Sequence, residues 1–203
     1  MLPMHIAAVL LASAALLAAC VPVPRVLYVP QSPDGELQYS TCAFNKHVPV
    51  ALRLRTAEIQ VTVAVATNDR GEFVEVHFEV PEGKTIVLLE DFVELTAGTP
   101  AQSTRSRFPT VSLVDTPIVN SFSSLAAMKA HQVPMSTPLV GQDLIVGNLP
   151  FGKNFWLATY VAPSSANEFL LTLPKFAVNG AVASLQPIKY RQQSIVGFAL
   201  INC

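Results

Sequence analysis

Apolar and polar residues alternate with a period of two through most of the chain after residue 36. The alternation is clearest in the stretches 59–66 and 74–80, which are separated by the turn residues 68–71. Because successive side chains of a strand point to opposite faces of a sheet, each stretch is typical of a half-buried β-strand. The two stretches and the short turn between them predict a β-hairpin.

Similar short stretches recur along the rest of the chain. The dipeptide Asn179-Gly180 is the strongest two-residue signal for another hairpin. Residues 150–153, Pro-Phe-Gly-Lys, are expected to form a turn, and Thr96–Arg107 lacks an apolar period and is expected to be an exposed loop. Further strands are expected at 37–42, 50–55, 85–89, 108–114, 144–149, 154–162, 169–173, 188–191 and 195–203.

Helix is almost absent from this pattern. Phe122, Leu125 and Met128 are spaced for one helical face, with Ser121 as a candidate N-cap, and they predict at most one short helix. About ten short strands at close spacing predict an all-β domain. We expect an antiparallel β-sandwich of about 8–10 strands, immunoglobulin-like in arrangement, formed by residues 37–203 as a single domain.

The beginning of the chain has a different character. Ile6–Ala19 is an uncharged apolar run, shorter than the ~20 residues that a membrane-crossing helix needs. Small residues end the run at Ala18 and Ala19, as expected just before a peptidase cleavage site. Residues 1–19 are therefore interpreted as a secretory signal peptide.

The tetrapeptide Leu17-Ala18-Ala19-Cys20 resembles the lipobox of bacterial lipoproteins. The resemblance implies that the chain is cut before Cys20, which carries the lipid. It also implies a bacterial envelope protein held to a membrane by acyl chains such as palmitate. Residue 21 is Val rather than Asp, which by this resemblance favours the periplasmic face of the outer membrane. An ordinary signal peptide that happens to contain Cys is the alternative.

Four prolines follow within a short distance of Cys20, at positions 22, 24, 30 and 33. Proline fixes φ and removes a backbone donor, so this segment favours extended polyproline II. One interpretation makes residues 20–36 a tether between lipid and domain. The other places Val26–Val29 on the domain as an edge strand.

Two cysteines remain after Cys20 is assigned to lipid. An oxidising envelope lets Cys42, in the first predicted strand, pair with Cys203. Such a disulfide would join the two ends of the domain. Free thiols, or a bond to another chain, are the alternatives.

Charge excludes one class of function. The chain has 13 Lys+Arg against 14 Asp+Glu, a net charge of −1, which does not fit a nucleic-acid-binding surface. Lys175, Lys189 and Arg191 gather near the C-terminus and can contact lipid headgroups or an acidic partner. A solvated strand face is the favoured interpretation.

Two groups of side chains are candidate metal ligands. Glu75, His77 and Glu79 share one face of a predicted strand, and carboxylate with imidazole can bind Zn²⁺. No second histidine is near in sequence, so we favour a solvated face and expect no metal.

The second group is Glu90, Asp91 and Glu94, which could hold Ca²⁺ but lacks the Asn/Asp/Gly spacing of calcium loops. We favour a charged edge that blocks strand pairing.

Catalytic motifs are weak. The sequence contains no Gly-x-Ser-x-Gly, and His47, His77 and His131, the histidines after the signal, have no recognisable catalytic context. The aromatic residues Phe155, Trp156 and Tyr160 could form a ligand platform, but a place in the sandwich core is favoured.

The sequence therefore predicts an envelope lipoprotein with a non-catalytic domain that binds or scaffolds an envelope protein, without a cofactor. The alternative is a periplasmic inhibitor or immunity lipoprotein that blocks a toxic or lytic enzyme with a loop such as Thr96–Arg107. An enzyme is the third class and is not favoured.

Overall fold

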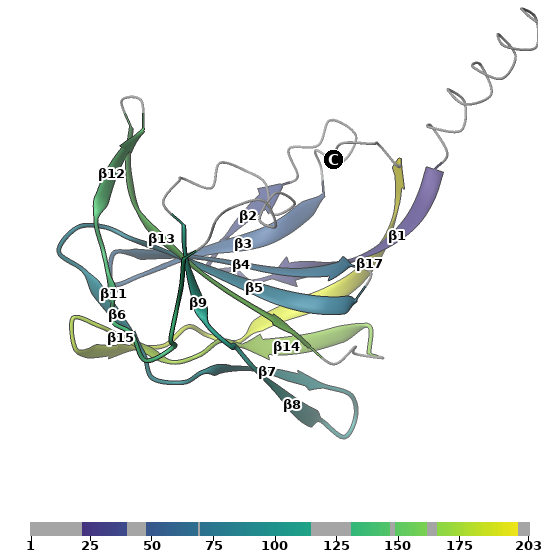
Figure 1. Cartoon of the computed structure of the whole chain (residues 1–203). Helices are drawn as coiled ribbons and strands as arrows, with labels where there is room; N and C mark the ends of the chain where they lie inside the picture. The colour runs from purple at the N-terminus through teal and green to yellow at the C-terminus, as the bar shows by residue number, and fades with distance from the viewer. Residues whose placement is uncertain are drawn as a thin grey trace, which may run out of the picture.

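The computed structural model describes residues 22–39, 48–68, 70–114, 131–146, 149–161 and 166–198. These residues form an all-β structure with antiparallel sheets, as predicted (Figure 1). They form seventeen strands, so the expected count of about 8–10 is wrong. The described ranges contain no helix, and hence none long and apolar enough to cross a bilayer.

The first sheet has five strands in the order β1–β17–β14–β7–β8. Its outermost members, β1 and β8, are edge strands, and every pair in it is antiparallel. The strands are β1 (Pro22–Gln31), β17 (Ile188–Phe198), β14 (Glu168–Thr172), β7 (Phe92–Ala97) and β8 (Gln102–Arg107).

The second sheet runs in the order β10–β9–β13–β5–β4–β3–β2, with β12 paired to β13. Its strands are β10 (His131–Val133), β9 (Val111–Val114), β13 (Leu149–Tyr160), β5 (Gly71–Val80), β4 (Ile59–Asn68), β3 (Pro49–Thr56), β2 (Glu36–Tyr39) and β12 (Asp143–Val146). A third sheet, β11–β6–β15–β16, consists of β11 (Leu139–Val140), β6 (Thr85–Leu88), β15 (Phe176–Val178) and β16 (Ala181–Ala183).

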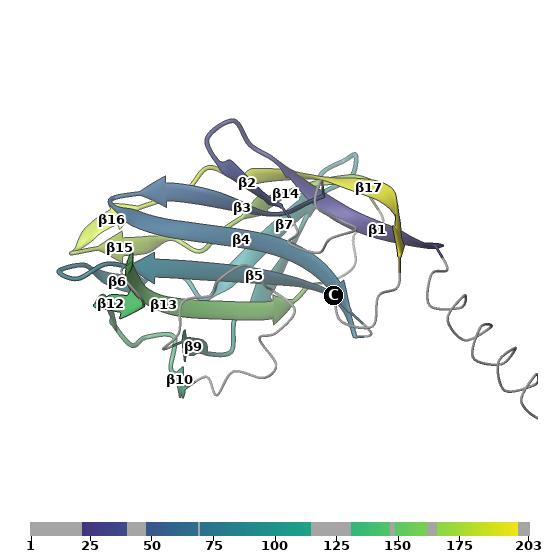
Figure 2. The same ribbon diagram turned by 90° about the horizontal axis from the view of Figure 1, so that it is seen from above.

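The apolar core lies between the layers (Figures 1 and 2). Alternate residues of β4 and β5 supply one side of it, and Phe78 on β5 meets Phe176 on β15 edge to face at 5.3 Å. Phe169 on β14 stacks on Tyr190 of β17 at 5.4 Å. Burial of these alternating side chains is what the period of two in the sequence predicts.

Both predicted hairpins are confirmed. The strands β4 and β5 pair from Gln60↔Glu79 to Asn68↔Gly71 without a register shift. At the β15–β16 turn, Asn179 and Gly180 have φ of 49° and 83°, the positive angles that a tight hairpin turn requires. The Asn179 carboxamide also accepts a hydrogen bond from the Thr85 backbone N–H at 2.8 Å, which ties the turn to β6.

Of the two interpretations of residues 20–36, the edge strand at Val26–Val29 is confirmed and the tether is wrong for Pro22–Gln31, which form the edge strand β1. Ten consecutive residues of β1 pair with β17 in unbroken register. Pro22, Pro24 and Pro30 occupy alternate positions, so the missing N–H groups can all lie on the side of β1 away from β17. The prolines therefore fit an edge strand as well as they fit a tether. Residues before position 37 thus belong to the first sheet.

The exposed loop predicted at Thr96–Arg107 is also wrong, because most of it forms the β7–β8 hairpin. Direct cross-strand pairs hold it: Arg105 Nε donates to Glu94 Oε2 at 2.6 Å, and the Thr96 and Ser103 hydroxyls lie 2.8 Å apart. Most β8 side chains are exposed on both faces, so the strand has no apolar alternation for a sequence pattern to detect.

Three further expectations need correction or lie outside the described ranges. The turn predicted at 150–153 is wrong, because these residues belong to β13, where 150–152 pair with β12 and Lys153 pairs with β5. An immunoglobulin-like arrangement is not confirmed: four consecutive strands, β2 to β5, lie side by side in one sheet, unlike the immunoglobulin order. The helix expected near Phe122–Met128 lies outside the described residues, as do Cys20, Cys42 and Cys203.

Candidate functional site

The outer face of the second sheet, away from the core, carries a row of polar side chains across its central strands. Cross-strand register sets His77 of β5 between Thr62 of β4 and Trp156 of β13. It likewise sets Glu75 between Ala64 and Ala158. The prediction that Glu75, His77 and Glu79 share a face is confirmed by this register.

The expectation that this face is solvated is wrong at its centre. Glu75 is 2% exposed and His77 is 6% exposed. Ser112 of β9 and Asn154 of β13 are buried as well. Burial of a polar side chain disfavours its charged form. We define the outer layer as five side chains on this face: Glu75, His77, Ser112, Asn154 and Trp156. The protonation states of its titratable members depend on that effect.

Glu75 is the acidic member of the outer layer. Burial raises the pKa of its carboxyl to about 8, so the group is protonated at neutral pH. Its cross-strand neighbours are alanines, which offer it no hydrogen bond. Within the described part of the chain, Glu75 Oε2 is buried without a hydrogen-bond partner.

His77 is the second titratable member. Burial lowers the pKa of its imidazole to about 3, which keeps the ring neutral at physiological pH. The ring lies 5.9 Å from that of Trp156, tilted by 40°. A neutral acid and a neutral imidazole two residues apart form a polar layer without charge.

Glu79, at the end of the row, is held differently. Its carboxylate accepts hydrogen bonds from Gln60 Nε2 at 2.8 Å and from the Gly152 N–H at 3.2 Å. A Cβ at Gly152 would lie 2.8 Å from the backbone carbonyl carbon of Val80 and 3.0 Å from Glu79 Cγ. Only glycine lets β13 come close enough for this contact. Among the described residues, no three His, Cys, Asp or Glu side chains are grouped for a metal ion.

The second acidic group is engaged in ion pairs, one for each carboxylate. Lys175 Nζ lies 3.1 Å from Glu90 Oε1, and Arg105 Nε lies 2.6 Å from Glu94 Oε2. Arg107 lies 3.5 Å from Asp91. A backbone hydrogen bond from Lys175, followed by its side-chain hydrogen bond, lowers the pKa of Glu90. The charged edge expected here is wrong at Glu94, because β7 pairs on both sides, with β14 and with β8.

The basic residues Lys175, Lys189 and Arg191 are also engaged in ion pairs, with two different carboxylates. Lys189 Nζ and Arg191 Nε both reach Glu168 across the β14–β17 pair, at 2.7 and 3.4 Å. Lys175 instead pairs with Glu90. The three cations therefore form no joint binding patch.

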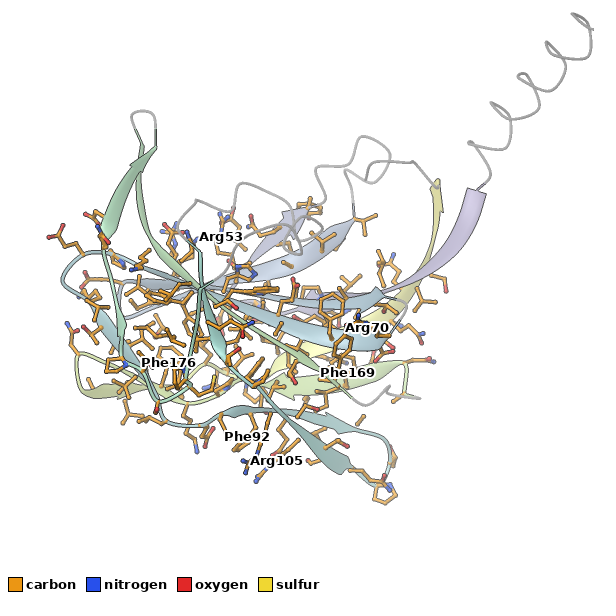
Figure 3. All side chains as sticks on the ribbon, viewed as in Figure 1. Arg53, Arg70, Phe92, Arg105, Phe169 and Phe176 are labelled. Carbon is orange, nitrogen blue, oxygen red and sulfur yellow. The ribbon has the colours of Figure 1, made fainter. Side chains whose placement is uncertain are left out.

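The three aromatic residues lie on both faces of β13. Phe155 is buried in the core, as favoured. Trp156 and Tyr160 lie on the opposite, outer face, where Tyr160 is 47% exposed and contacts Phe73 at 5.9 Å. The expectation of a core position is therefore wrong for Trp156 and Tyr160. Phe169 and Phe176, which are labelled in Figure 3, are buried like Phe155.

A shallow pocket lies where β9, β10, β11 and β13 meet. Its volume of about 130 Å³ is below the ~300 Å³ at which ligand pockets begin. The lining is mainly apolar, with the Lys153 side chain as a polar group. The lining residues are Leu113, Val133, Thr137, Pro138, Leu139, Val140, Lys153 and Phe155.

Comparison with protein-family models, with curated proteins and with solved structures finds no match to this chain. Its function must therefore be argued from its own residues.

Sequence reasoning missed the pocket and the burial of the outer layer. The pocket joins segments far apart in the chain, so no local motif marks it. The burial of Glu75 had one signal: the alanines Ala64 and Ala158 beside it are not typical of a solvated strand face.

Proposed function

We propose that this chain is a lipid-anchored lipoprotein of the bacterial envelope, on the periplasmic face of the outer membrane, whose β-sandwich is a non-catalytic binding or scaffolding domain. The anchor is Cys20 of the Leu17–Cys20 motif. The observation that carries the proposal is the position of β1, which begins at Pro22, directly after this motif. A lipid on Cys20 would therefore hold the sandwich itself close to the membrane.

The protonation and ion pairing of the candidate catalytic groups support the proposal that the domain is non-catalytic. Burial holds Glu75 and His77 neutral, and the carboxylates of Glu90, Asp91 and Glu94 are engaged with basic side chains. General acid–base catalysis works best with groups whose pKa lies near the working pH and that reach substrate. A side chain 2–6% exposed is poorly placed to reach one.

The anchor is tested by Cys20→Ser. We expect the wild type to incorporate labelled fatty acid, whereas Cys20→Ser incorporates none and stays as the unprocessed precursor. Absence of label in the wild type would show that the lipoprotein proposal is wrong. Cys42→Ser is the matched control, because it keeps Cys20 and should retain the label.

The binding role is tested by chemical crosslinking in intact cells, followed by purification of the lipoprotein from membranes. Capture of a structural protein of the envelope is the expected result. Sandwich variants at exposed positions should weaken that capture without affecting membrane attachment. If no envelope protein is enriched over a Cys20-anchored control domain, the binding proposal fails.

An inhibitor or immunity lipoprotein is the second candidate, favoured by the β7–β8 hairpin. The segment that was expected to insert as a loop is instead a hairpin with exposed polar side chains on β8. An exposed hairpin with a firm cross-strand register suits insertion into an enzyme cleft. Capture of a toxic or lytic enzyme in the same crosslinking experiment, lost on deletion of 98–101, would support this candidate.

We also propose the Cys42–Cys203 disulfide, which would join the ends of the domain. Such a bond is worth about 2–4 kcal/mol in practice, less than the chain-entropy account gives for so long a loop. Peptide mapping without reduction should yield one species that joins the two cysteine peptides. Two alkylatable thiols in protein taken directly from the envelope would contradict it.

A further inference from the structure

The ribbon formed by β1 and β17 has two distinct faces. The register pairs Tyr28 with Gln192 and Pro30 with Tyr190, so even-numbered residues of both strands share one face. Tyr28 is 5% exposed and Tyr190 is fully buried. Tyr28 also donates a hydrogen bond to Glu72 of β5 and packs edge to face on Phe169 at 5.3 Å. The even-numbered face is therefore the one that packs on the body of the sandwich.

This packing stops short of the end of the ribbon. Val26 lies on the same face as Tyr28, two residues nearer the start of β1, yet it is 45% exposed. Figures 1 and 2 both show the ends of β1 and β17 running together past the ends of β4 and β5. By register, the face beyond Val26 carries Pro24 opposite Val196 and Pro22 opposite Phe198.

The projecting end thus has an apolar sequence at the register positions beyond the exposed Val26. We define the ribbon tip as residues 22–26 of β1 with residues 194–198 of β17. Among the even-numbered positions of the ribbon tip, only Ser194 is a polar residue. An apolar surface left uncovered on a folded domain marks a contact with another apolar medium.

The position of the ribbon tip in the chain identifies that medium. Cys20 precedes Pro22 by two residues, and two residues of extended chain span at most ~7 Å. If Cys20 carries lipid, the ribbon tip cannot leave the neighbourhood of the headgroups. We propose that the ribbon tip is the membrane-contacting surface of the domain, with its apolar face at the boundary between headgroups and acyl chains. This inference rests on the proposed lipid anchor.

The exposed valine Val182 does not share this position. Val182, 70% exposed on the edge strand β16, belongs to the third sheet. Figure 2 places β16 at the opposite end of the molecule from the start of β1. A domain oriented by its ribbon tip would hold β16 away from the bilayer. Val182 is therefore a matched control for Val26: both are exposed valines on edge strands.

The test uses the mature, acylated chain in vesicles of phosphatidylethanolamine and phosphatidylglycerol that contain brominated phospholipid, a short-range quencher of tryptophan. Val26→Trp and Val182→Trp each add one reporter at an exposed site where the fold tolerates it. The emission of Trp156, measured in the unsubstituted chain, is subtracted. Flotation of the vesicles reports separately whether the chain is anchored.

We expect Trp at position 26 to lose more than half of its emission, as an interfacial segment buried ~5–10 Å should, and Trp at position 182 to lose almost none. Flotation without quenching at position 26 would overturn the inference and leave the anchor in place. Equal quenching at both positions would also overturn it, because the domain would then lie on the membrane without a preferred surface. A chain that neither carries acyl groups nor floats would refute the proposed function itself.

Discussion

Two stretches of the molecule that are polar in sequence differ in their exposure to solvent. Glu75 and His77 lie at the centre of the second sheet and are almost fully buried, whereas β8 lies at the edge of the first sheet with most of its side chains exposed. Both stretches are polar in sequence. The difference shows that the place of a strand within its sheet, rather than its composition, decides whether its polar groups meet water.

The two glutamates Glu75 and Glu94 show the electrostatic result. Burial among alanines raises the pKa of Glu75 to about 8. A side-chain hydrogen bond from Arg105, and then one from Ser103, lowers the pKa of Glu94. The same side chain is thus neutral in one region and charged in the other at neutral pH. The guanidinium of Arg105 also lies over the Phe92 ring, 4.6 Å from the ring centre. Both side chains are labelled in Figure 3.

The largest expected effect is the pH dependence caused by Glu75. In the unfolded chain its carboxyl ionises near pH 4.5, while in the folded protein it stays protonated to about pH 8. The free energy of unfolding should therefore fall as pH rises from 4.5 to 8, by an amount of order 3–5 kcal/mol. In Glu75→Gln this fall should largely disappear, as measured by urea unfolding across the range. Glu94→Gln is the control and should retain it; equal slopes in Glu75→Gln and Glu94→Gln would contradict the buried acid.

The next effect should come from His77, with the opposite sign. The folded imidazole has its pKa lowered from 6.5 to about 3, so its stabilising contribution is complete above pH 6.5 and is lost as pH falls towards 3. His77→Phe should keep about 2–4 kcal/mol more of its stability than the wild type over this window. Thermal unfolding at decreasing pH measures the difference. An imidazole NMR signal from His77 that titrates near its ordinary pKa would contradict the assignment.

Gly152→Ala tests the difference between the buried sheet and the exposed strand β8 through a backbone contact rather than through a charge. The added Cβ would lie 2.8 Å from the Val80 backbone, and the shift needed to relieve it would also disturb the hydrogen bond to Glu79. We expect a loss of about 1–3 kcal/mol in the free energy of unfolding, typical of overpacking. Gln102→Ala on the exposed strand β8 is the control and should stay within ~0.5 kcal/mol. Equal effects would show that β13 does not depend on the glycine.

The smallest effect is expected for Arg105→Gln at the exposed edge. The pair with Glu94 is close, but the arginine side chain is 65% exposed, so water and salt screen the interaction. The unfolding midpoint should barely move, and added salt should make the variant and the wild type still more alike. A large drop would mean that the β7–β8 hairpin depends on this pair for its formation.

Sequence reasoning succeeded where the local pattern and the tertiary environment agree. The alternation in β4 and β5 predicted both strands and their hairpin, and Asn179-Gly180 predicted the β15–β16 turn. It failed for β8, which lies at an edge and has no apolar face to alternate. It failed again at Pro150–Lys153, where turn-forming residues lie in a strand because β12 and β5 pair with them.

The sequence predicted which residues share the face of the candidate site, but not which of them are buried. Spacing alone placed Glu75, His77 and Glu79 on one face. The burial of Glu75 and His77 depends on elements distant in sequence, which no local pattern reports. The engagement of Glu90, Asp91 and Glu94 by Lys175, Arg107 and Arg105 likewise needed the three-dimensional structure.

The pairing of β1 with β17 also determines when the fold can be completed. The two strands come from opposite ends of the described chain, so β1 has no strand partner until residues 188–198 are available to pair with it. Pairing of such distant segments carries a high loop-closure cost and is slow. Until β17 arrives, β1 is an open edge that other chains can pair with. Completion of the first sheet is therefore a late event in folding, and the interval before it is when the chain is most exposed to mispairing.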